Sequence, residues 1–129
     1  MFRSMFSLAV GASCLTTLLA SPSAATAADE PITITARFSP APGREAEAQA
    51  RLLQVVAYVR RVEPGAMYRL HRSSGEPTTF LFYETYPSQA ALDHHSKVTL
   101  PAFAKEYGPT PEGLWAGAPA IETFRELAR

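Results

Sequence analysis

The sequence predicts an α+β domain in which helices cover one face of a four-stranded antiparallel sheet. Two observations predict it. Strand-like alternation and helical periodicity follow one another in the order β-α-β-β-α-β, and the strand-like segments are rich in β-branched and aromatic residues. Clusters of proline and glycine separate these segments, as expected for turns.

The N-terminal segment predicts export. A single charged residue, Arg3, precedes an apolar run from Met5 to Ala20, and small residues follow. This is the layout of a secretory signal, with Ala25-Thr26-Ala27 as the best cleavage site. We therefore expect a signal peptide over residues 1–27 and a domain over residues 28–129 that is periplasmic or secreted.

Two other interpretations of this segment remain open. A transmembrane span needs about 20 predominantly apolar residues, and this run is shorter and includes polar residues. A lipid anchor on Cys14 would need a lipoprotein motif, in which Gly11 is a poor fit. Cys14 is also the only cysteine of the chain, so the domain after the signal can form no disulfide, thiolate metal site or cysteine nucleophile.

The composition excludes one class of partner. The chain carries 12 basic and 12 acidic side chains, mixed along its length, and this balance argues against nucleic acid as a partner. A hydrophobic content of 47% supports a real core. Because a domain of about 100 residues buries only a modest share of its surface, dimerisation would be a natural supplement.

The first strand and helix are predicted from a change of period. Ile32 to Phe38 alternates apolar and polar residues, as in a half-buried strand. Arg44 to Val62 is amphipathic with a helical period. Its apolar stripe consists of Ala48, Leu52, Val55, Val56, Val59 and Val62, and its polar stripe of Arg44, Glu47, Arg51, Gln54, Tyr58 and Arg61. Glu63-Pro64-Gly65 closes the helix, because proline cannot continue it.

A hairpin is predicted to follow. Ala66 to Arg72 and Thr79 to Tyr86 have strand-like patterns, and the polar segment between them is a plausible loop. The second strand is apolar at nearly every position, so we expect both faces of the sheet to be covered. In a chain this short the cover is most simply a second copy of the same sheet, which predicts a homodimer.

Helical pieces and a last strand complete the domain. Ser88 is the expected cap of a helix over Gln89 to Lys97, and a second piece is expected over Pro101 to Tyr107. A loop rich in proline and glycine then carries the lone Trp115, and Ala120 to Glu126 is the expected last strand. The resulting order is the ferredoxin-like split βαβ arrangement.

Short motifs occur in a fixed order along residues 32–124. They are Ile34-Thr35-Ala36-Arg37-Phe38 with Pro42-Gly43-Arg44-Glu45, Glu63-Pro64-Gly65, Tyr68-Arg69-Leu70-His71-Arg72, Phe82-Tyr83-Glu84 and Ala91-Leu92-Asp93-His94-His95. Together they resemble the antibiotic biosynthesis monooxygenase (ABM) domain, which includes quinol monooxygenase-like proteins. The resemblance implies a homodimer of ferredoxin-like subunits with a barrel-like core. It also implies oxygenation of electron-rich aromatic substrates by O2 without flavin or metal.

Two departures limit what the resemblance implies. Tyr86 stands where family members commonly have tryptophan, two residues after the strand glutamate. Haem-degrading relatives use asparagine, tryptophan and histidine, and the domain after the signal contains no asparagine. Haem degradation by that set of residues is therefore disfavoured.

Oxygenation without a cofactor needs a base and a dry pocket, because a hydroquinone gives up an electron to O2 once its hydroxyl is deprotonated. Histidine is the usual base near neutral pH. The resemblance aligns His95 with a family histidine, which makes it the first candidate for base or substrate orienter; a solvated helix position is the alternative, and is preferred for His94. His71 is a further candidate. We expect no metal site, because adjacent histidines point to different sides of a helix.

The hairpin register decides the composition of the pocket. If Arg72 lies opposite Thr79, the face that carries His71 also carries the aromatic residues of the following strand. The substrate-binding residues expected on this arrangement are Tyr86, Phe82, Arg69 and, from the loop, Trp115. A slip of one residue would send the two sets of side chains to opposite faces.

Glu84 is the remaining candidate catalytic residue. It would raise the basicity of a histidine or accept a substrate proton, or else form a cross-strand ion pair with Arg69 or Arg37. Tyr86 would donate to a developing phenolate or fill the core with its hydroxyl satisfied. Trp115 would cover the pocket or pack at the dimer interface.

These features predict an exported, cofactor-independent monooxygenase that acts on a quinol or related phenolic compound. Two alternatives stay open. One is a non-catalytic dimer that binds a small aromatic ligand in the same pocket. The other is an isomerase-like enzyme acting on a small carbonyl metabolite, since one fold hosts unrelated chemistries.

Overall fold

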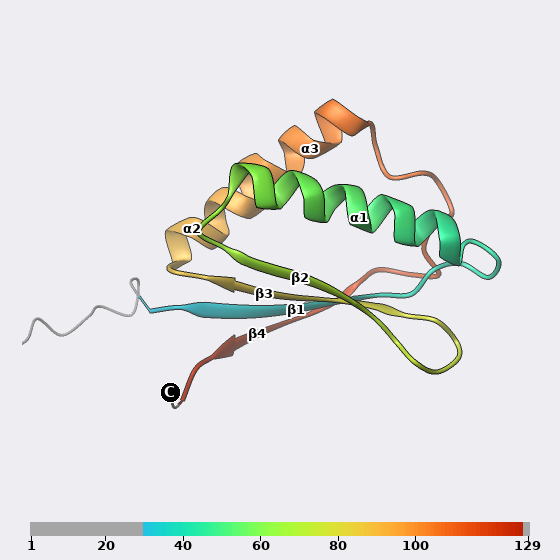
Figure 1. The fold of residues 1–129 in the computed structure, drawn as a ribbon, viewed down its shortest axis with the longest axis horizontal. Helices are drawn as coiled ribbons and strands as arrows, with labels where there is room; N and C mark the ends of the chain where they lie inside the picture. Colours follow the sequence, from blue (N-terminus) through green and yellow to red (C-terminus); the bar gives the residue numbers. More distant parts are fainter. Residues whose placement is uncertain (1–29, 128–129) are drawn as a thin grey trace, which may run out of the picture.

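The computed structural model describes residues 30–127 (Figure 1). The predicted signal peptide and its cleavage site lie outside these residues. The elements are β1 (Ile32–Phe38), α1 (Glu45–Val62), β2 (Met67–Arg72), β3 (Phe80–Tyr86), α2 (Gln89–His94), the π-helical turn η2 (His95–Thr99), α3 (Leu100–Tyr107) and β4 (Ala120–Arg125). Their order confirms the predicted α+β class and the β-α-β-β-α-β sequence of elements.

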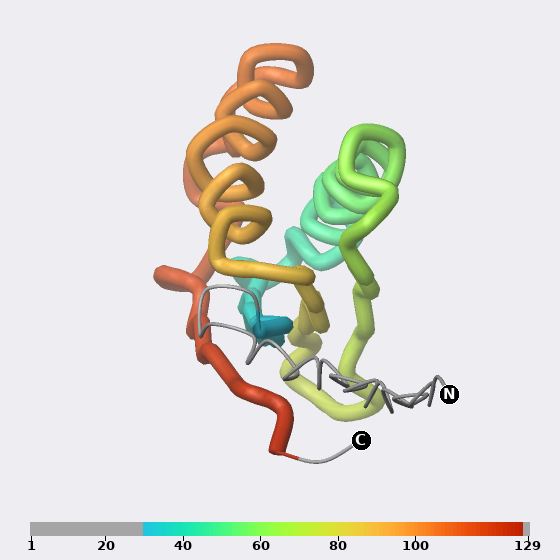
Figure 2. Tube along the Cα trace, turned by 90° about the vertical axis from the view of Figure 1, so that its left-hand side faces the viewer, coloured from blue at the N-terminus to red at the C-terminus, as the bar shows by residue number. Residues whose placement is uncertain are grey.

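The four strands form one antiparallel sheet in the order β2-β3-β1-β4. Helix α1 and the segment from α2 to α3 lie on the same side of this sheet, and no described element covers its other side (Figure 1). Seen along the sheet, α1 and the segment from α2 to α3 run side by side over the strands (Figure 2). We call the face under the helices the inner face and the opposite face the outer face.

Helix α1 packs on the inner face through the predicted apolar stripe. Ala48, Leu52, Val56 and Val59 are buried there, as expected for an amphipathic helix on a core. Tyr58, which the sequence assigned to the polar stripe, is also buried. The reason is a second neighbour, because its ring contacts those of Phe103 and Tyr107 in α3.

The two predicted helical pieces after β3 are one continuous rod. Ser88 caps it, accepting a hydrogen bond from the backbone N–H of Ala91 at 3.2 Å. The π-helical turn η2 joins α2 to α3, so Pro101 falls in the first turn of α3, where its missing N–H is tolerated. Gly108 ends the rod with φ of 82°, a conformation that glycine adopts readily.

The hairpin register differs from the predicted one by one residue. Arg72 lies opposite Phe80, whereas the prediction placed it opposite Thr79. Tyr68 therefore faces the helices, and the neighbouring Arg69 and His71 point to the outer face, where both are exposed. This register is favoured physically because the alternative would place two polar side chains, one always cationic, under the helices without partners.

The outer face is open in the described part of the chain. It consists of Thr33, Thr35 and Arg37 of β1, Met67, Arg69 and His71 of β2, Leu81, Tyr83 and Thr85 of β3, and Glu122 and Phe124 of β4. Met67, Tyr83 and Phe124 are 37%, 38% and 44% exposed. Among residues 30–127, no helix has the length and apolar character needed to cross a membrane.

Candidate active site

A cavity of about 520 Å³ lies between the inner face and the helices. This volume is within the range of about 300–1,000 Å³ that small-molecule sites occupy. Most of its wall is apolar, with contributions from Phe38, Leu52, Val55, Phe82, Phe103 and Trp115. The cavity can therefore hold a flat apolar molecule, and the few polar groups on its wall decide which chemistry is available.

Polar side chains gather at one level of the cavity. The strand register aligns Tyr68, Glu84, Ile34 and Thr123 in one row across the inner face. His95 lines the cavity from the first residue of η2. The ring of His95 lies 5.4 Å from that of Tyr68 and 5.1 Å from that of Tyr86, between centroids. The sheet and the helical rod thus bring two titratable groups, Glu84 and His95, into one cavity.

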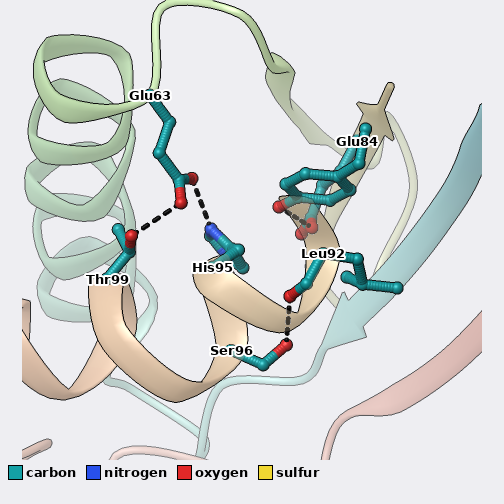
Figure 3. Close-up of polar contacts among 7 residues, drawn as sticks. Glu63, Glu84, Leu92, His95, Ser96 and Thr99 are labelled. Atoms are coloured by element: carbon teal, nitrogen blue, oxygen red, sulfur yellow. Dashed lines mark hydrogen bonds and ion pairs between the residues drawn. The ribbon is translucent and has the colours of Figure 1, made fainter. Parts of the chain in front are cut away.

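His95 is paired with Glu63, the residue that ends α1. Its Nδ1 lies 2.7 Å from Oε2 of Glu63, and the hydroxyl of Thr99 donates to Oε1 of the same carboxylate at 2.6 Å (Figure 3). His95 and Thr99 are each 3% exposed, and the side chain of Glu63 is 10% exposed. The contact is therefore a shielded, charge-assisted pair and not a solvated surface one.

The pairing leaves the second ring nitrogen of His95 available. A carboxylate only accepts hydrogen bonds, so in this contact the donor is a proton on Nδ1. No described residue donates a hydrogen bond to Nε2. This atom is also not a fully buried atom that lacks a hydrogen-bond partner, since the described residues contain no such atom. Because His95 lines the cavity, Nε2 is an acceptor for a proton or hydroxyl of a bound molecule.

Glu84 has a different environment from Glu63. It is 5% exposed, lines the cavity and accepts a hydrogen bond of 2.8 Å from the Tyr86 hydroxyl. Burial raises the pKa of Glu84 above its ordinary value, although the Tyr86 hydrogen bond and the charge of His95 oppose this shift. Burial and the negative charge of Glu84 also raise the pKa of Tyr86, which keeps its hydroxyl a donor.

Replacing Glu84 by glutamine is expected to change how stability depends on pH. A carboxyl whose pKa is raised by folding stabilises the protein fully below its unfolded pKa of about 4.3, and this contribution is lost as pH rises through the folded pKa. Glutamine does not titrate and can still accept from Tyr86. We therefore expect the free energy of unfolding of Glu84→Gln, relative to wild type, to increase from pH 4 to pH 8 in denaturant titrations.

The matched control for this comparison is Glu112→Gln, which changes an exposed carboxylate in the loop between α3 and β4. A difference between Glu84→Gln and wild type that is the same at every pH would show that the carboxyl of Glu84 titrates alike in the folded and unfolded chain.

The predicted site residues fall into three groups. His95, Glu84, Phe82 and Trp115 line the cavity. Tyr86 is buried behind Glu84, to which it donates, and does not line the cavity itself. His71 and Arg69 lie on the outer face, so the register that placed them in the pocket is wrong.

The geometry also bears on the alternatives weighed for Glu84, His94 and Trp115. Glu84 forms no ion pair with Arg69 or Arg37, because both arginines lie on the outer face. His94 is exposed, as preferred from the sequence. The ring of Trp115 packs 5.1 Å from that of Phe38, between centroids, while also lining the cavity.

Sequence reasoning missed Glu63, Tyr68 and Arg51. Glu63 was assigned to the end of the helix and to a motif of the ABM resemblance, with no role in the site, although an acidic residue at a helix C-terminus opposes the macrodipole and so calls for another explanation. Arg51 lines the cavity away from His95, with its guanidinium over the Phe103 ring at 4.5 Å. No pattern distinguished Arg51 from the solvated residues of its stripe.

No metal site is predicted from the sequence. Within residues 30–127, no group of three or more histidine, cysteine, aspartate or glutamate side chains is arranged to hold a metal ion. The candidate histidines do not lie together, since His71 is on the outer face and His94 is exposed.

The model of the family described as antibiotic biosynthesis monooxygenase matches residues 31–103. The chain belongs to the ABM family. A Caulobacter crescentus CB15 protein assigned to the antibiotic biosynthesis monooxygenases has a similar crystal structure, with 31% identity, a TM-score of 0.64, and coverage of 78% of this chain and 93% of that one. The structure of PA3566 from Pseudomonas aeruginosa is also similar, with 28% identity, a TM-score of 0.60, and coverage of 78% and 98%.

A curated relative also matches this ABM chain. It is the uncharacterised protein sll1783 of Synechocystis sp. PCC 6803, 37% identical over 82 residues, which cover 60% of this chain and 55% of the relative. The chain thus spans about half the length of that relative.

Proposed function

We propose that this ABM protein is an exported, dimeric, cofactor-independent monooxygenase that oxidises a quinol or a related phenolic or polycyclic aromatic compound with O2. One observation carries the proposal: His95, held by Glu63 at Nδ1, lines a mostly apolar cavity of about 520 Å³. A base in a dry aromatic pocket is what a reaction of O2 with a deprotonated phenol needs from a protein.

In the proposed reaction, Nε2 of His95 removes the proton of a hydroquinone hydroxyl, and the phenolate passes one electron to O2. The semiquinone and superoxide then combine at a ring carbon, which forms the new carbon–oxygen bond. That carbon loses its hydrogen as the O–O bond breaks, which releases water and leaves a carbonyl. Hydroquinone and O2 thus give hydroxyquinone and water, and the substrate supplies every electron.

Glu84 would act on a second oxygen of the substrate. It lines the same cavity, and burial raises its pKa; when protonated, the carboxyl can donate a hydrogen bond to that oxygen. A donor near the developing charge stabilises it, as in an oxyanion site. The aromatic ring of the substrate would pack against Phe82, Trp115 and the apolar residues of α1.

Export fits this chemistry. The proposed signal peptide over residues 1–27 would deliver the domain to the periplasm or the medium. Reduced nicotinamide is not freely supplied there, so an oxygenase that takes its electrons from the substrate suits that compartment.

Purified protein is expected to consume O2 with a hydroquinone and no added cofactor, and the same titration should change the fluorescence of Trp115, the only tryptophan. An oxygen electrode and a fluorimeter measure the two signals on one sample. A fluorescence change with O2 uptake at background would support the non-catalytic binding protein instead. Turnover of a carbonyl compound without O2 uptake would support the isomerase-like alternative.

A further inference from the structure

We propose that Glu63 is the positioning residue of this site: it fixes His95 with Nδ1 protonated and Nε2 bare toward the cavity, so that Nε2 is the atom that takes the substrate proton. This inference rests on the proposed function for the identity of the reaction, but its structural part can be tested without any substrate.

The contacts of Glu63 carry the proposal. Both of its oxygens are engaged, Oε2 by His95 at 2.7 Å and Oε1 by Thr99 at 2.6 Å (Figure 3). With both oxygens held and its side chain 10% exposed, the carboxylate cannot rotate freely or exchange its partner for water. The orientation of the imidazole ring is therefore determined by a fixed acceptor.

The location of Glu63 requires an explanation beyond the helix. It is the C-terminal cap residue of α1, where the helix dipole disfavours a negative charge. Its partners both come from η2, a π-helical turn, and such turns are rare and frequent at functional sites. The acidic cap of α1 and the π-helical turn η2 are each locally unfavourable. Together they bring the carboxylate of Glu63 into contact with His95.

The fixed tautomer has a chemical consequence. When Nε2 takes a proton, His95 becomes a cation beside a buried carboxylate, which stabilises that charge. The opposite tautomer would present an N–H to the cavity and could not accept the proton of a substrate hydroxyl. Glu63 therefore acts through His95 and does not itself line the cavity.

Nitrogen-15 NMR of the full protein labelled at histidine tests this assignment at neutral pH. We expect wild-type His95 to show a protonated Nδ1 and an unprotonated Nε2. In Glu63→Leu, Nδ1 has no acceptor and a proton there would be a buried, unpaired N–H, so we expect the proton to move to Nε2. Val98→Ala is the matched control, because it changes a side chain of the same turn that is 51% exposed and should leave the tautomer of His95 unchanged.

A wild-type His95 protonated on Nε2, or a Glu63→Leu spectrum identical to that of wild type, would overturn the proposal. If Glu63→Leu does not fold, the wild-type tautomer alone decides. In the oxygen electrode, Glu63→Leu is expected to lower turnover about 10²- to 10⁴-fold. Background O2 uptake by wild type with an Nδ1-protonated His95 would reject the proposed function and retain the role of Glu63 as the residue that fixes the ring.

Discussion

Replacing His95 by alanine is expected to lower O2 uptake with a hydroquinone by about 10²- to 10⁴-fold, the usual contribution of a positioned general base. His95 offers the one imidazole that lines the cavity within residues 30–127, and its Nδ1 partner Glu63 would lose its charge-assisted contact. Trp115 fluorescence should still respond to the ligand, because the apolar wall is retained. The variant would then bind the substrate and fail to turn it over.

His94→Ala is the matched control for this experiment. His94 precedes His95 on the same helical rod and is exposed. Because exposed substitutions away from special features have small effects, O2 uptake should stay within about twofold of wild type. Unchanged turnover in His95→Ala would remove His95 from the mechanism and leave Glu84 as the remaining predicted catalytic residue that lines the cavity.

Most of the fold was predictable because it depends on patterns that act locally. The alternation of Ile32 to Phe38 and the helical period from Arg44 to Val62 each report which side of an element meets the core. Ser88 marks a helix start by a single side-chain hydrogen bond to the following turn. The structure has each of these elements within one or two residues of the predicted bounds.

The hairpin register was not predictable because it depends on contacts made across the chain. A two-residue periodicity fits either register equally well until it is known which face the helices cover. Burial of Tyr68 beside Phe82, with ring centroids 4.8 Å apart, is gained only in the observed register. With Tyr68 facing the helices, His71 points to the outer face, away from the cavity. No local sequence pattern indicates this packing contact.

The site was predictable in part for the same reason. His95 and Glu84 were identified through a resemblance that covers whole motifs, and both line the cavity. Glu63 is 32 residues away from His95 in sequence, and only the packing of α1 against η2 brings them together. Its position against the helix dipole was the one available indication.

The outer face supports the proposed homodimer. Three of its apolar or aromatic side chains, Met67, Tyr83 and Phe124, are more than a third exposed, and they border a shallow depression with Thr33 and Thr35. Exposed apolar groups gathered on one side of a sheet are typical of an interaction surface. A second copy placed on this face by two-fold symmetry would cover both sheets with the same set of residues.

Tyr83→Asp is therefore expected to convert the dimer into a monomer. Tyr83 lies on the outer face, in the middle of the central strand β3, opposite Thr35 on one side and Arg69 on the other. A symmetric interface on this face would therefore contain it twice. The new carboxylate would lie opposite Arg69, and removing this charged pair from water at an interface costs about 2–5 kcal/mol, which raises the dimer Kd roughly 30-fold to several thousand-fold. Sedimentation velocity over a concentration series measures the change.

Leu53→Asp is the matched control for the dimer. Leu53 is 51% exposed on α1, on the helical side of the sheet, so the same apolar-to-acidic change there should leave the dimer intact. Thermal unfolding of both variants separates dissociation from loss of the fold. If Tyr83→Asp sediments like wild type while Leu53→Asp does not, the copies associate through the helices, and the open face of the sheet must be covered by something else.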